Sequence, residues 1–213
     1  MNKRVHGFGG LLGHFAVAFL LVAVVPTMAQ AYGTAREAFE AGRLAKDSKV
    51  RRAAFSEGMV LAQARLDKNA NDAEGLFWKA VNMGAEALER GKMSALPVVP
   101  KMEALLLTLD KVDPAYEQAG AARVLGRLYH QAPAVISVGS NKEARKFLAK
   151  AVGLAPGHPG NLAFAADFLY VHGDRSVARD YAVKSLRLLL ERNWGSEGEE
   201  WRELAVTVVE KTQ

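Results

Sequence analysis

Hydrophobic side chains recur along this chain at one fixed spacing. Starting from Met102, from Ala144 and from Ala178, the residues at relative positions 0, 3, 4, 7 and 10 are apolar, apart from Ser185 in the third copy. This spacing places them on one face of an α-helix. Three copies of one amphipathic stripe form an internal repeat, which predicts that the helices pack on one another as a stack of similar units.

Similar stripes predict helices before and after these three. They cover residues 35–44, 50–67, 73–89 and 196–211. Residues that cap helices or form turns separate them, namely Thr34, Asp47-Ser48 and the run 69–72. Gly91 follows the helix at 73–89 and is able to end it in the left-handed conformation.

One stretch in the middle of the chain carries a more specific pattern. Leu125 and Tyr129 are four residues apart and share one face of a helix, beside Gly126, which lets a facing helix approach closely because it has no side chain. The second helix of this unit carries the stripe that begins at Ala144, and Pro156 ends it. This order of small and large residues resembles the tetratricopeptide repeat, a pair of antiparallel helices that stacks on its neighbours.

The period of the repeat is longer than the standard one. Pro114 to Pro156 is 42 residues and Ala70 to Pro114 is 44, whereas a standard repeat has about 34. The surplus lies in loops at 91–100 and 132–140, each between the two helices of one pair, so both loops should project from the same edge. The sequence predicts an all-α, tetratricopeptide-like stack of about four antiparallel helix pairs with a C-terminal capping helix.

Residues 1–31 are predicted to be a signal peptide, which leaves residues 32–213 as a single helical domain. A basic start at Lys3 precedes an apolar run over residues 11–25, and Ala29-Gln30-Ala31 offers the small-x-small site of a signal peptidase. The apolar run is shorter than the roughly 20 residues of a membrane span. An uncleaved anchor is the alternative. If the signal peptide is cleaved, we expect the mature protein to be released into the periplasm.

Composition narrows the function. The chain has no cysteine, which leaves no disulfide framework and no thiolate metal site. A net charge of +5, spread evenly, does not indicate nucleic-acid binding. His130, His158 and His172 lack the spacing of metal ligands, so we expect exposed or singly hydrogen-bonded histidines. The sequence shows no catalytic constellation, and we expect no enzyme, no cofactor and no metal.

About half of the chain resembles the T component that accompanies some tripartite ATP-independent periplasmic (TRAP) transporters, an extended-loop variant of the tetratricopeptide fold. The matching features are Phe77-Trp78, Asp113 to Tyr116, Val124 to Tyr129, the loop from Ala132 to Gly139, and Lys142-Glu143-Ala144 with the run to Pro156. The resemblance implies a periplasmic accessory protein that binds a solute-binding protein or a small ligand. Those relatives are lipoproteins, whereas this chain lacks the required cysteine, so we expect no membrane tether after signal cleavage.

The repeat register predicts which side chains face the concave groove. Arg123 and Arg127 are one helical turn apart, and together they are able to bind a carboxylate through paired hydrogen bonds. The alternative is that both arginines pair with acidic residues on a neighbouring helix. For Trp78, the alternative to a ligand contact is that its side chain belongs to the hydrophobic core. The groove candidates are Arg123, Arg127, His130, Asp167, Tyr170, Phe77 and Trp78.

Two functions of different classes fit these residues. In the first, the groove or the loop edge binds a periplasmic protein such as a solute-binding protein. In the second, apolar side chains between the helix pairs enclose a cavity that carries a small organic acid or hydrophobic molecule. A cavity lined by Phe, Trp and Met with an arginine favours the second function, and a shallow charged groove favours the first.

We expect the exported protein to begin at Tyr32, because the cleavage site ends at Ala31. Amino-terminal sequencing of the protein recovered from the periplasm measures this directly. A recovered chain that still begins at Met1 would contradict the prediction and favour the anchor.

Overall fold

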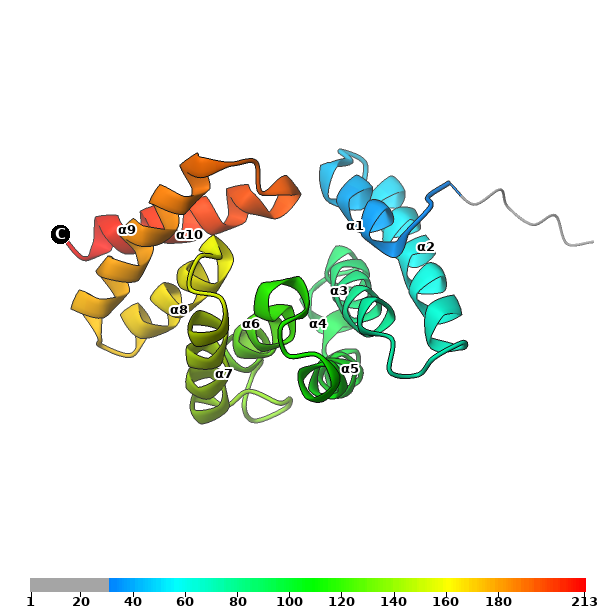
Figure 1. Cartoon of the computed structure of the whole chain (residues 1–213), viewed down its shortest axis with the longest axis horizontal. Coiled ribbons are helices and arrows are strands. Elements are labelled where there is room, and N and C mark those ends of the chain that lie inside the picture. The colour runs from blue at the N-terminus through cyan, green and yellow to red at the C-terminus, as the bar shows by residue number, and fades with distance from the viewer. Residues whose placement is uncertain (1–30) are drawn as a thin grey trace, which may run out of the picture.

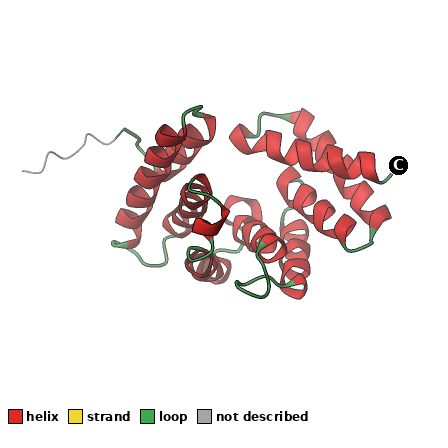
Figure 2. Cartoon of the chain, turned by 180° about the vertical axis from the view of Figure 1, so that it is seen from behind, coloured by secondary structure: helices red, strands yellow, loops and turns green. Residues whose placement is uncertain are grey.

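The computed structural model describes residues 31–213, so nearly all of the predicted signal peptide lies outside it. In this part of the chain the structure contains ten α-helices, one short 3-10 helix and no strand (Figure 2). The prediction of an all-α fold is confirmed. The elements are α1 (Ala35–Leu44), α2 (Ser48–Leu66), α3 (Ala73–Glu89), α4 (Lys92–Ala95), α5 (Val99–Val112), α6 (Tyr116–Gln131), α7 (Asn141–Leu154), α8 (Pro159–Val171), α9 (Arg175–Glu191), η1 (Gly195–Glu197) and α10 (Gly198–Lys211).

The helices pack as successive pairs along an arch. The pairs are α1/α2, α3/α5, α6/α7 and α8/α9, and α10 packs on α8 and α9 (Figure 1). The two long connections, which contain residues 91–98 and 132–140, line one common apolar cavity. They therefore lie at the same edge, as the period predicts. Among the described residues, no helix has the length and apolar character needed to cross a bilayer.

Local sequence explains where the helices begin. Thr34 caps α1, because its side chain accepts a hydrogen bond from the backbone N–H of Glu37 while the Glu37 carboxylate accepts from the backbone of Thr34. Asp47 and Asp72 cap α2 and α3 in the same direction, each accepting from backbone N–H groups of the first turn. Gly91 follows α3 with a positive φ of 113°, but its ψ of 156° is not that of the left-handed helical conformation that the sequence predicts there.

A close contact between paired helices lies at Gly126. A Cβ atom there would lie 2.6 Å from Cγ of Leu148 and 3.0 Å from the Leu148 backbone nitrogen, so α6 and α7 approach each other as closely as a glycine allows. Leu125 and Leu148 are both buried beside this contact. The close approach that the repeat pattern predicts is present.

The last helix does more than cap the stack. Arg43 of α1 donates from Nη1 to a Glu200 carboxylate oxygen at 3.2 Å and from Nη2 to the Ser196 carbonyl oxygen at 3.2 Å. The Ser196 N–H in turn donates to Glu40 at 3.1 Å. These bonds join the first helix to the segment before α10, more than 150 residues later, and the arch becomes a ring. Sequence analysis predicts only a terminal cap here.

Replacing Gly126 by Leu should lower the free energy of unfolding by about 1–3 kcal/mol, because the added side chain overpacks the contact with Leu148. Urea unfolding measures the change. The matched control is Gly153→Leu in α7, where a Cβ meets no atom within 4 Å and leucine favours the helix. If both variants unfold at the same urea midpoint as the parent, the close contact at Gly126 does not contribute to stability.

Candidate functional site

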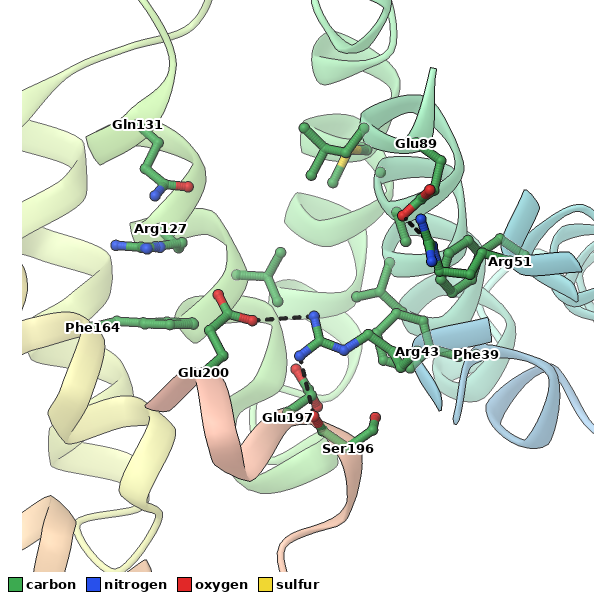
Figure 3. Close-up of a pocket in the computed structure, with 17 residues that line it drawn as sticks. Phe39, Arg43, Arg51, Glu89, Arg127, Gln131, Phe164, Ser196, Glu197 and Glu200 are labelled. Atoms are coloured by element: carbon green, nitrogen blue, oxygen red, sulfur yellow. Dashed lines mark hydrogen bonds and ion pairs between the residues drawn. The ribbon is translucent and has the colours of Figure 1, made fainter. Parts of the chain in front are cut away.

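A cavity of about 410 Å³ lies inside the ring (Figure 3). Its walls come from α1, α2, α3, α5, α6, α8, η1 and α10, so elements from both ends of the chain are needed to build it. We call it the central cavity. Most of its wall is apolar, and the aromatic and aliphatic side chains that form it are Phe39, Phe55, Val81, Leu88, Met102, Val124 and Phe164.

Three arginines line the central cavity, and each is already paired with an acid. Arg51 lies 2.8 Å from a Glu89 oxygen, and this hydrogen bond lowers the pKa of Glu89 despite some burial. Arg43 binds Glu200 across the ring closure. Arg127 donates to Asp167 of α8 at 2.6 Å. The cavity therefore combines an apolar body with balanced charges around it.

Of the two arginines that the sequence predicts for the groove, Arg127 is the one that lines the central cavity. Figure 3 shows its guanidinium lying flat over Phe164, with 4.8 Å between Cζ and the ring centroid. In the amide orientation that satisfies both groups, the Gln131 oxygen accepts from Nη2 and Nε at 2.7 and 3.1 Å. Burial would raise the pKa of Asp167, but the His130 hydrogen bond and the Arg127 charge outweigh it, and the pKa is lowered. His130 Nε2 lies 3.5 Å from the same Asp167 oxygen.

Arg123 does not share the central cavity with Arg127. It is 3% exposed, and its Nη1 donates to the carbonyl oxygens of Glu117 and Gln118 at 3.1 and 3.4 Å and to Oδ1 of Asn161 at 3.3 Å. Burial lowers the pKa of this guanidinium. The two arginines therefore serve separate spaces. Arg127 pairs with a neighbouring helix, as the alternative reading of the sequence expects.

Arg123 lines a second, smaller cavity of about 240 Å³, which we call the aromatic pocket. Phe77 and Trp78 line it from α3, although both are almost wholly buried in the core. The indole N–H of Trp78 donates to the Tyr116 hydroxyl at 3.2 Å. Trp194 and Trp201 line the pocket from the C-terminal part of the chain, beside His158.

Tyr170, the remaining candidate, lies apart from both cavities. Its ring packs with the side chains of Arg175 and Lys211, whose cationic ends lie 5.8 and 5.9 Å from the ring centroid. It therefore faces α9 and α10 and lines neither cavity.

The residues that sequence reasoning missed come from the two ends of the chain. Arg43 and Arg51 belong to the first helix pair, and Glu197, Glu200 and Trp201 follow α9. No motif marks them, because they become neighbours only through the ring closure.

His158 is buried, contrary to the expectation of exposed or hydrogen-bonded histidines, and its Nδ1 has no hydrogen-bond partner in residues 31–213. The same residues contain no cluster of three or more His, Cys, Asp or Glu placed to hold a metal ion.

The structure is that of an all-helical protein whose helices pack as adjacent pairs around an open central cavity. A family model described as TRAP transporter T-component matches residues 29–191, and the chain belongs to this family. The family gives the protein an accessory role with TRAP transporters, which are membrane-associated transport systems. No curated protein matches the chain.

Burial of His158 should make stability depend on pH. Burial, together with the charges of Arg123 and Arg192, lowers the pKa of His158 from 6.5 to about 2. Between these values the unfolded chain binds a proton that the folded protein does not, so stability falls as pH drops below 6.5, by about 1.4 kcal/mol per pH unit at most. Urea unfolding at pH 7 and pH 5 should show less of this loss in His158→Phe. The control His172→Phe, which keeps the buried histidine, should retain it, and equal pH dependence in both variants would contradict the assignment.

Proposed function

We propose that this protein is a periplasmic accessory component of a TRAP transporter that carries a small organic acid with an apolar body in the central cavity. The single observation that supports this is the cavity itself, an open space of about 410 Å³ lined mainly by aromatic, methionine and aliphatic side chains with Arg127 in its wall. Small-ligand sites have this character, an apolar enclosure with a few polar groups that orient the ligand. The proposal includes no catalytic step and no cofactor.

Arg127 is the group that receives the acid. Nη1 is committed to Asp167, but Nη2 and Nε contact only the neutral amide of Gln131. A carboxylate presents two oxygens to two parallel N–H groups and is a stronger acceptor than an amide. The ligand's acid group therefore displaces the Gln131 oxygen, while its apolar part lies over Phe164 and along the aliphatic wall.

Export and cleavage fit the amino-terminal end of the described chain. The backbone nitrogen of Tyr32 lies 3.1 Å from Oε1 of Glu57, and the nitrogen of Ala31 lies 2.6 Å from the same oxygen. Cleavage after Ala31 turns the Tyr32 nitrogen into a charged amine, which strengthens its bond to the Glu57 carboxylate. A periplasmic location remains part of the proposal.

The second candidate function, binding of a periplasmic solute-binding protein, is favoured by the loop edge. Met93 is 76% exposed, and Val135 and Ile136 are 95% and 64% exposed. Met93 and Ile136 line an apolar cavity of about 470 Å³ between the two long connections. Clusters of exposed apolar side chains mark interaction surfaces. This surface is compatible with the first function, because a carrier must also deliver its ligand.

Replacing Arg127 by Ala should weaken binding of an apolar anion. With 8-anilino-1-naphthalenesulfonate as the probe, followed by its fluorescence, the loss should be about 1.5–3 kcal/mol, the scale of a hydrogen bond to a charged group. The neutral analogue N-phenyl-1-naphthylamine should lose little, because it makes no such bond.

The matched control is Lys142→Ala, which removes a cation from α7, outside the central cavity. It should bind both probes as the parent does. Thermal unfolding of Arg127→Ala must be recorded alongside, because the variant also removes the partner of Asp167. If Arg127→Ala loses stability while its affinity for the anionic probe is unchanged, the arginine is structural and the loop edge becomes the better candidate surface.

A further inference from the structure

The aromatic pocket contains all three tryptophans of the chain, Trp78, Trp194 and Trp201. It lies next to the central cavity, and Glu197 lines both. Its residues come from α1, α3, α6, the start of α8 and the segment between α9 and α10. Neither the family assignment nor the carrier role gives this pocket a function.

The pocket contains polar groups without hydrogen-bond partners in the described part of the chain. Arg123 uses Nη1 for its three hydrogen bonds, while its Nε and Nη2, which are not wholly buried, make none among residues 31–213. The indole Nε1 of Trp201 and Nδ1 of His158 are buried without a partner in that range. Buried polar groups in folded proteins are nearly always paired, so this cluster calls for an acceptor from outside the chain.

The electric field around His158 has the sign that an anionic group requires. His158 lies between the indoles of Trp194 and Trp201, with ring centroids 5.2 and 4.8 Å away. Burial is the first cause of its low pKa, and the positive charges of Arg123 and Arg192 are the next. A planar carboxylate matches the free edge of the Arg123 guanidinium, which presents parallel N–H groups.

The pocket is also lined by a carboxylate that forms no ion pair among the described residues, that of Glu197. Burial raises the pKa of Glu197, and the charges of Arg123 and Arg43 oppose the rise. Within the described chain, no cation lies within 4.0 Å of this carboxylate to form an ion pair. Glu40, by contrast, accepts from the Ser196 backbone, and Glu117 pairs with Arg36 at 3.2 Å.

The charges of the whole lining balance. Three guanidinium groups (Arg36, Arg123, Arg192) face three carboxylates (Glu40, Glu117, Glu197). An ion of either sign would upset this balance of charges. A neutral molecule that carries both charges is able to contact Arg123 and Glu197 at once.

We propose that the aromatic pocket is a second ligand site that binds a small zwitterion, with its carboxylate on Arg123 and its ammonium group beside Glu197. The indole rings around the pocket favour a cation by their π-faces, above all a quaternary ammonium group. A volume of about 240 Å³ limits the ligand to roughly the size of an amino acid. The evidence for this site does not rest on the organic-acid site proposed in the central cavity.

Three molecules of nearly the same shape test the proposal. Glycine betaine carries both charges, 3,3-dimethylbutanoate keeps only the carboxylate, and choline keeps only the ammonium. Because every tryptophan lines the pocket, intrinsic fluorescence of the unlabelled protein reports binding. We expect betaine to bind on the order of tenfold or more tightly than either isostere, the scale of one charge-assisted hydrogen bond.

Glu197→Gln tests the contact proposed for the ammonium group of the ligand. It leaves the buried Arg123 in place and so avoids the folding risk of replacing that residue. The variant should weaken betaine on the order of tenfold or more and leave 3,3-dimethylbutanoate unchanged or tighter. Glu199→Gln is the matched control, since the Glu199 side chain is 72% exposed and lines neither cavity. Each variant should still bind 8-anilino-1-naphthalenesulfonate in the central cavity. Such binding would show that the ring around this cavity is intact.

The outcomes separate clearly. If 3,3-dimethylbutanoate binds as tightly as betaine, the pocket recognises a simple anion and the zwitterion proposal is wrong. Equal affinity of choline and betaine would assign the pocket to cations and would also overturn it. No fluorescence change with any of the three at tens of millimolar would mean that the pocket is not a site for this class. None of these results depends on whether the central cavity carries an organic acid.

Discussion

A buried hydrogen-bond network at Arg123 and Asn161 holds the middle of the ring together. Asn161 is fully buried; its amide nitrogen lies within 3.2 Å of the carbonyl oxygens of Gln118, Ala151 and Ala155, and its oxygen accepts from Arg123. These contacts tie the start of α6 to the end of α7 and the start of α8. They also fix Glu117, Gln118 and Ala119 at φ values of 48°, 53° and 65°, which side chains normally disfavour. Removing either side chain would leave buried carbonyl groups unpaired.

Both cavities depend on this network. It positions α6 so that Arg127 faces inward across Phe164, while Arg123, one turn earlier, stays buried beside the aromatic pocket. The ring closure between Arg43 and Glu200 supplies the remaining wall. This ion pair is about one-third exposed, so by itself it stabilises the closed ring only weakly. The buried network at the centre therefore contributes more to the ring than the partly exposed ion pair at its ends.

Sequence reasoning predicts what is local or periodic. The cap at Thr34, the close approach at Gly126 and the common edge of the two long connections all follow from spacing and turn chemistry. The separate environments of Arg123 and Arg127 do not, because two residues of the same type one turn apart give the same pattern whether they are buried or accessible. The aromatic pocket is also hidden. Trp78 and Trp201 come from opposite ends of the chain, and their proximity depends on how the whole stack curves.

Glu197 gives the two cavities a physical connection. Its carboxylate lines both, and its pKa responds to charges on both sides, Arg123 in the aromatic pocket and Arg43 in the central cavity. A ligand ammonium beside Glu197 stabilises the ionised carboxylate, whereas an organic anion in the central cavity disfavours it. Any such effect is reciprocal, because the coupling free energy between two bound ligands is the same whichever binds first. If both proposed ligands bind, occupancy of one cavity would alter affinity in the other through the charge of Glu197.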